Sequence, residues 1–141
     1  MLSLHDFLPY RLSIASNAVS DRVAHVYQAR FGLKIPEWRV IAVVAEQGHT
    51  TQAGLVAATQ MDKMTISRAV VALVERGLLA RTEAADRRTL ELALTAEGKA
   101  LHTEIAPLAL GIEAELLAGF SEAERTQLLA LLGRLEACAK P

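Results

Sequence analysis

The chain has 141 residues, of which 52% are hydrophobic but only 4% aromatic, and its formal net charge is −1. This length suits one domain, or two small lobes around a shared core, and the abundant Ala and Leu favour helices. The few Pro and Gly residues argue against a disordered chain, while the balanced total charge neither requires nor excludes a nucleic-acid partner.

The sequence shows no sign of export or of membrane insertion. Its single cysteine, Cys138, excludes an intramolecular disulfide. Residues 1–20 lack the apolar run of a signal peptide, and no segment reaches the roughly 20 uncharged apolar residues that a membrane span requires. We therefore expect a cytoplasmic protein with no membrane partner.

The first predicted element is one long amphipathic helix that starts near residues 3–6 and ends near Gly32. Pro9 lies in its first turn, where proline is tolerated. Apolar residues recur at intervals of three and four, as a buried helical face requires: Leu8, Leu12, Ala15, Val19, Val23, Val26 and Phe31.

Two shorter helices follow. Pro36 suits the first turn of the second helix, and Gly48 ends it. Thr50 and Thr51 offer an N-cap for a short third helix. Gly54 lies inside that helix, where glycine lowers helix stability by roughly 1 kcal/mol relative to alanine and should loosen this part of the chain.

Asp62 is a strong N-cap for a fourth helix, which ends at Gly77. Its closeness to the third helix makes a helix-turn-helix pattern. The face formed by Ile66, Val70, Leu73 and Val74 must be buried, so four polar residues of the N-terminal half point elsewhere: Lys63, Thr65, Ser67 and Arg68. They are suited to base edges or phosphates; the alternative is an ordinary solvated helix face.

A β-hairpin is predicted next. Residues 90–94 alternate apolar and polar with period two, residues 78–81 form the partner strand, and the polar run 82–88 joins them. Residues 62–99 hold seven basic and six acidic side chains, against three and six in residues 100–141. A capped helix beside a hairpin with arginines at its tip favours DNA binding, through the major groove and the adjacent minor groove.

Two terminal helices complete the chain. Thr95 caps a fifth helix that runs to about residue 118 and bends near Pro107, and Ser121 with Glu124 forms a capping box for the sixth. Their apolar residues cover more than one face: Leu116, Leu117, Phe120, Leu128, Leu129, Leu131, Leu132 and Leu135. We therefore expect these helices, with the first helix, to pair two copies of the chain.

Four motifs stand in a fixed order: Asp-Lys-Met-Thr-Ile-Ser-Arg at 62–68, Leu-Val-Glu-Arg-Gly-Leu-Leu at 73–79, Asp-Arg-Arg at 86–88 and Leu-Thr-Ala-Glu-Gly at 94–98. They resemble the MarR (multiple antibiotic resistance regulator) family of winged-helix transcription factors, and the resemblance covers essentially the whole chain. It implies a mainly α fold with a small β-hairpin wing. Residues 34–95 would form the DNA-binding lobe, and residues 1–33 and 96–141 the helical dimerisation region, of a single domain.

The resemblance also implies a function. Members of this family form symmetric homodimers on pseudo-palindromic operators in double-stranded DNA. They commonly repress transcription and release the DNA when a small, often aromatic and anionic, effector binds. Arg88 matches the wing arginine that enters the minor groove, with Asp86 expected to orient Arg88 and Arg81 by charge-assisted hydrogen bonds. Arg87 is the expected phosphate contact; the alternative is an exposed salt bridge that only stiffens the turn.

Tyr10, Arg11, Trp38 and Arg39 are the candidates for the effector pocket. An aromatic wall beside a guanidinium suits an aromatic carboxylate or its thioester. The alternative is that Trp38 belongs to the core and that both arginines are ordinary surface residues.

No cofactor or metal is expected, because the four histidines show no metal-ligand spacing, and a zinc site built on His102 and Glu104 is a remote alternative. Cys138 has only Lys140 as a nearby cation and no resolving partner, which disfavours a redox-responsive regulator. No phosphate loop or nucleophile–base pair indicates an enzyme. A winged helix that binds protein in place of DNA stays open as a further alternative.

Overall fold

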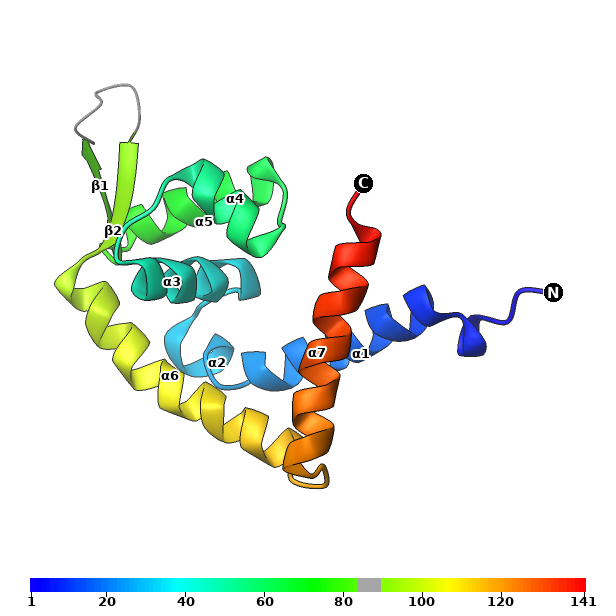
Figure 1. Cartoon of the computed structure of the whole chain (residues 1–141). Helices are drawn as coiled ribbons and strands as arrows, with labels where there is room; N and C mark the ends of the chain where they lie inside the picture. The colour runs from blue at the N-terminus through cyan, green and yellow to red at the C-terminus, as the bar shows by residue number, and fades with distance from the viewer. Residues whose placement is uncertain (84–89) are drawn as a thin grey trace. The chain divides into compact units, whose positions relative to one another are not determined.

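The structure is a computed structural model that describes residues 1–83 and 90–141. It divides into two compact units, Met1–Ala109 and Leu110–Pro141. Helices dominate the described residues, and one antiparallel hairpin supplies the strands β1 and β2 (Figure 1). The predicted fold class, mainly α with a small β-hairpin wing, is therefore confirmed.

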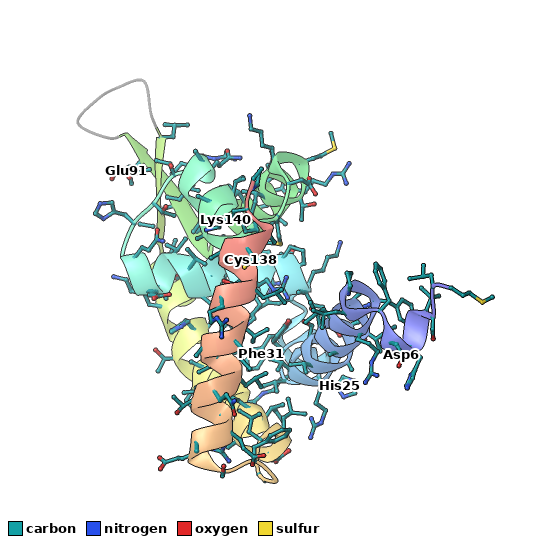
Figure 2. The ribbon with its side chains drawn as sticks, turned by 45° about the vertical axis from the view of Figure 1, so that its right-hand side comes forward. Asp6, His25, Phe31, Glu91, Cys138 and Lys140 are labelled. Carbon is teal, nitrogen blue, oxygen red and sulfur yellow. The ribbon has the colours of Figure 1, made fainter. Side chains whose placement is uncertain are left out.

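The N-terminal segment differs from the single long helix that the sequence predicts. A 3-10 turn (Leu4–Asp6) precedes α1 (Leu8–Ala24), and a separate short α2 covers Gln28–Phe31. His25 is the first residue of the break, and Phe31 is the last residue of α2 (Figure 2). The break turns Tyr27 into the core, where it is 2% exposed and stacks on Trp38 with ring centroids 5.6 Å apart. Burying this ring favours the break over a continuous helix.

The next three helices contain the helix-turn-helix, which the second and third of them form. They are α3 (Ile35–Gln47), α4 (Gln52–Thr59) and α5 (Lys63–Glu75), and the sequence predicts all three. The Thr51 side chain accepts from the Gly54 backbone N–H at 3.0 Å. The side chains that pack these helices together are fully buried: Val40, Ile41, Val44, Leu55, Ile66, Val70 and Leu73.

Gly54 has a packing role in addition to its expected cost to the helix. A Cβ atom at this position would lie 2.3 Å from the Thr50 hydroxyl oxygen, so Thr50 would have to shift. Thr50 is 9% exposed, and its backbone exchanges two hydrogen bonds with Leu92, at 3.0 and 2.7 Å. The glycine lets α4 pack closely against a residue that holds the wing.

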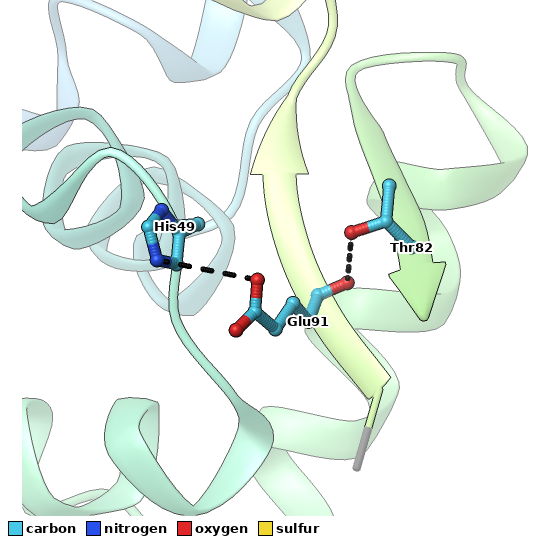
Figure 3. Close-up of polar contacts among 3 residues, drawn as sticks. All are labelled: His49, Thr82 and Glu91. Carbon is cyan, nitrogen blue, oxygen red and sulfur yellow. Dashed lines mark hydrogen bonds and ion pairs between the residues drawn. The ribbon is translucent and has the colours of Figure 1, made fainter. Parts of the chain in front are cut away.

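The wing consists of β1 (Leu79–Glu83) and β2 (Leu90–Leu94), with Leu79 opposite Leu94. β1 therefore runs two residues beyond the predicted strand. Glu91 links the two edges of β2, because its backbone carbonyl accepts from the Thr82 hydroxyl at 3.5 Å and its carboxylate lies 4.0 Å from the His49 ring (Figure 3).

The start of α6 (Ala96–Leu116) is fastened to the end of the helix-turn-helix. The Thr95 hydroxyl donates to the Gly77 carbonyl at 2.6 Å and accepts from the Gly98 N–H at 3.0 Å, while the Thr95 N–H donates to the Leu78 carbonyl at 3.1 Å. A Cβ atom at Gly98 would lie 2.1 Å from the Leu78 carbonyl oxygen. This close approach explains the Leu-Thr-x-x-Gly motif.

The second unit contains the end of α6 and α7 (Glu122–Ala139). The predicted capping box is present, with Ser121 N–H donating to Glu124 at 2.8 Å and Glu124 N–H donating to Ser121 at 3.1 Å. Large apolar side chains stay exposed in this unit: Leu110, Leu116, Phe120, Leu128, Leu129 and Leu131. None of the described helices is long and apolar enough to span a membrane.

Replacing Gly98 with alanine should destabilise the protein by about 3 kcal/mol, the upper range for overpacking, because the new methyl overlaps a backbone carbonyl that cannot swing away. Thermal and urea denaturation measure the change. Gly111→Ala is the matched control in the same helix, since a Cβ there meets nothing within 4 Å. Equal stability of the two variants would contradict this account of the junction.

Candidate nucleic-acid interface

The N-terminal half of α5 presents the polar face that the sequence predicts. Lys63, Ser67 and Arg68 are exposed, while Ile66 and Leu73 on the other side are fully buried. Two hollows flank the helix. One, of about 460 Å³, lies against α4 and includes Gln52, Ala53, Val56, Lys63, Ile66 and Ser67. The other, of about 200 Å³, lies against the start of α3 and includes Lys34, Pro36, Thr65 and Arg68.

This relief has a functional meaning. An α-helix with a hollow on each side can enter a groove of the DNA, with its two sides facing the edges of that groove. The major groove of B-DNA admits an α-helix, and cationic side chains at such a helix can contact guanine edges or phosphates.

Thr65 is the one predicted contact whose side chain is already engaged. Its hydroxyl donates to Asp62 at 2.8 Å, and its backbone N–H donates to the same carboxylate at 2.9 Å. Thr65 is partly exposed, and because its hydroxyl hydrogen is donated to Asp62, its oxygen can only accept, for example from a base amino group. Its more evident task is to complete the N-terminal cap of α5.

These two hydrogen bonds also act on the Asp62 carboxyl. The Thr65 backbone N–H, and then its hydroxyl, hold the pKa of Asp62 below its ordinary value of 3.8. The carboxylate is therefore charged and bonded at neutral pH, and it satisfies donors that a helix N-terminus would otherwise leave unpaired.

Arg76, at the other end of α5, anchors the helix. Its guanidinium donates to the Phe31 carbonyl at 2.8 Å and to the Gly32 carbonyl at 3.1 Å. Gly32 has φ 65°, a left-handed conformation that glycine adopts without strain. No local pattern in the sequence indicates this role of Arg76, because its acceptors are backbone atoms more than 40 residues away.

Only part of the predicted wing contact is described. Arg81 is exposed in β1. Asp86, Arg87 and Arg88 lie outside the described residues, so their assignments as orienting, phosphate-binding and minor-groove residues stay predictions.

The candidate effector residues fall into two groups. Trp38 is partly buried and lies between two rings, with centroids 5.6 Å from Tyr27 and 5.7 Å from His102. Arg39 beside it donates to the Ser20 hydroxyl at 3.2 Å. Burial raises the pKa of Tyr27, and the positive charge of Arg39 offsets part of this rise. His102 was missed as a neighbour of Trp38, because no local spacing links residues so far apart.

Tyr10 and Arg11 form the second group, near the start of α1. Both are exposed, and Arg11 donates to the His5 carbonyl at 3.2 Å. They stay candidates for the effector site, whereas Trp38 stacks on the Tyr27 and His102 rings.

The alternative sensor residues occupy other surroundings. His102 stacks on Trp38, and Glu104 lies 3.7 Å from Arg30. Within residues 1–83 and 90–141, no three His, Cys, Asp or Glu side chains gather as metal ligands would. Cys138 is exposed near the end of α7, close in sequence to Lys140 (Figure 2).

Asp62→Ala should lower the melting temperature and weaken DNA binding, because it removes both acceptors of the α5 cap. Asp62→Asn should keep most of the cap near neutral pH, because the amide oxygen still accepts from the Thr65 N–H and the amide NH2 can donate to the Thr65 hydroxyl oxygen. Because the pKa of Asp62 is lower in the folded protein than its ordinary value of 3.8, the wild type keeps the stabilisation by this cap above pH 3.8. It loses the stabilisation as pH falls through the lower folded value, whereas the Asn variant does not titrate there. Circular dichroism melts across pH test this, and an unchanged Ala variant would refute it.

Comparisons with known proteins agree with this geometry. A MarR family model matches residues 31–89. The HTH-type transcriptional regulator PecS of Dickeya dadantii (strain 3937) is 30% identical over 130 residues, which cover 89% of this chain and 76% of PecS. A MarR/EmrR family regulator from Acinetobacter sp. ADP1 has a TM-score of 0.89 at 26% identity, over 96% of each chain.

A further solved structure is that of Bordetella bronchiseptica BpsR, whose DNA binding is regulated by 6-hydroxynicotinic acid. It has a TM-score of 0.86 at 26% identity and covers 96% of this chain and 97% of BpsR. The family model, the PecS relative and these folds lead to one conclusion: the chain belongs to the MarR family of winged-helix transcription regulators.

Proposed function

We propose that this protein is a sequence-specific repressor that binds a pseudo-palindromic operator as a homodimer and leaves it when a small aromatic acid, or an acyl thioester of one, binds. The observation that carries the DNA part is the exposed face of α5. It places Lys63, Ser67 and Arg68 on a capped helix that stands between two hollows. Membership of the MarR family supports the same reading.

Each polar residue has a distinct proposed role. Arg68 reads a guanine bidentately, Ser67 bonds a base edge or a phosphate, and Lys63 contacts a phosphate. Thr65, whose hydroxyl hydrogen is donated to Asp62, accepts from a base amino group. Arg81, Arg87 and Arg88 supply backbone and minor-groove contacts from the wing, with Asp86 orienting them.

Exposed apolar side chains on the terminal elements support the homodimer. In the first unit Phe7, Leu8, Ile14 and Val19 are at least 41% exposed, and in the second Leu129 is 72% exposed. α7 has no buried residue of its own. Such faces are covered when two chains associate. Residues 62–99 of one chain are nearly neutral, with seven basic and six acidic side chains. Two copies of this segment on one operator double the number of phosphate contacts.

The ring cluster around Trp38 supports an aromatic effector. Trp38 is partly exposed, so a planar acid can contact the open edge of its ring while Arg39 pairs with the carboxylate. Tyr10 and Arg11 are further candidates for this contact. The regulation of BpsR by 6-hydroxynicotinic acid gives a first compound to test.

DNA binding is tested by fluorescence anisotropy with duplexes from the promoter region beside the gene. Arg68→Ala should relax sequence choice at one position per half-site and cost about 1–3 kcal/mol there. Arg88→Ala should weaken binding to all duplexes, and it should reduce the slope of log affinity against log salt concentration by about one per wing. Arg134→Ala, an exposed arginine of α7, is the control and should leave binding unchanged.

The expected stoichiometry is two chains per duplex. If the wild type retains no duplex even at low salt, the DNA proposal is rejected, and a winged helix that binds protein is favoured in its place.

Effector binding has a built-in reporter, because Trp38 is the single tryptophan of the chain. Adding 6-hydroxynicotinic acid, related aromatic acids or their thioesters should change Trp38 fluorescence and release the DNA. Arg39→Gln should weaken binding of the active compound about tenfold, because a charged hydrogen bond is lost. Arg134→Gln should leave this binding unchanged. Unchanged fluorescence with the whole panel would refute the effector assignment and leave DNA binding intact.

A further inference from the structure

The outer face of α5, the proposed recognition helix, carries apolar side chains as well as polar ones. Nine residues separate Met64 from the buried Leu73, which is about two and a half turns at 3.6 residues per turn, so Met64 lies opposite the core. It is 64% exposed, and Val71, seven residues further along the same side, is 41% exposed. Among residues 35–80, all of which the structure describes, these are the only large apolar side chains exposed to this degree.

Isolated exposed apolar residues are common on protein surfaces and by themselves need no partner. Met64 differs in its place, because it lies beside Lys63 and one turn before Arg68, at the end of the helix that a helix-turn-helix directs to base edges. The charge of these neighbours suits a polyanion and disfavours an apolar protein groove. The occupant of this face is therefore a DNA duplex.

The major groove offers one apolar group to such a side chain, the C5-methyl group of thymine. An unbranched, polarisable methionine adapts readily to a single methyl group. From Met64 to Val71 the helix rises about 10 Å, at 1.5 Å per residue. These two apolar side chains therefore span more than one base pair, and Arg68 lies between them along the helix axis.

We propose that Met64 is a specificity-determining residue that selects a thymine through its methyl group, next to the base pair that Arg68 reads. This inference rests on the proposed DNA-binding function and adds to it a named base and a named atom. It also gives the recognition helix a part of its selectivity that is independent of hydrogen bonds and of salt.

The test uses duplexes that the wild-type protein selects from a random-sequence pool. Each thymine is replaced singly by uracil, which removes the methyl group and leaves the hydrogen-bonding edge unchanged. Replacement at one thymine per half-site should weaken wild-type binding about fourfold, as expected for one buried methyl group. Met64→Ala should bind the thymine and uracil duplexes equally, and Met64→Leu should restore the preference.

Lys63→Ala is the matched control, because it should weaken both duplexes and keep the fourfold ratio. The inference is overturned if no uracil replacement affects the wild type, or if Met64→Ala keeps the full preference for thymine. Either result leaves DNA binding intact. Failure of the wild type to select any duplex is a separate outcome, and it rejects the proposed function together with this inference.

Discussion

The hydrogen bonds of Thr95 with Gly77 and Leu78 are the constraint on which the DNA-reading lobe depends. At this point Gly77 and Leu78, which join α5 to β1, lie within hydrogen-bond distance of Thr95, which joins β2 to α6. The hairpin therefore leaves and returns to the same place, and the wing has a fixed base beside the recognition helix. Gly98 makes the approach close enough, since any side chain there would overlap the Leu78 carbonyl.

The features that the sequence predicts well are those settled by near neighbours in the chain. The caps at Thr51, Asp62 and Ser121 each depend on a residue three positions away, and the structure contains all three. The outward positions of Lys63, Ser67 and Arg68 follow from helical period alone, because the buried face of α5 is strongly apolar. The roles of Asp86, Arg87 and Arg88 depend on the family resemblance and remain predictions.

What the sequence could not predict depends on distant partners. The break before α2 is stabilised by stacking of Tyr27 on Trp38, and Trp38 in turn stacks on His102 from α6. Neither pairing has a local signal, so a continuous helix was the natural expectation. Gly54 shows the same limit, because its cost to the helix is visible in the sequence but its close packing on Thr50 is not.

The pairing of Thr50 with Leu92 has a consequence for the protein in concentrated solution. An exposed strand edge is a template for intermolecular pairing and aggregation. Thr50 occupies part of the second edge of β2, so in the described residues β1 is the outer strand of the ribbon. β1 is only five residues long and carries an exposed arginine at its centre, Arg81. The residue expected to face DNA phosphates thus also discourages the wings of free molecules from joining edge to edge.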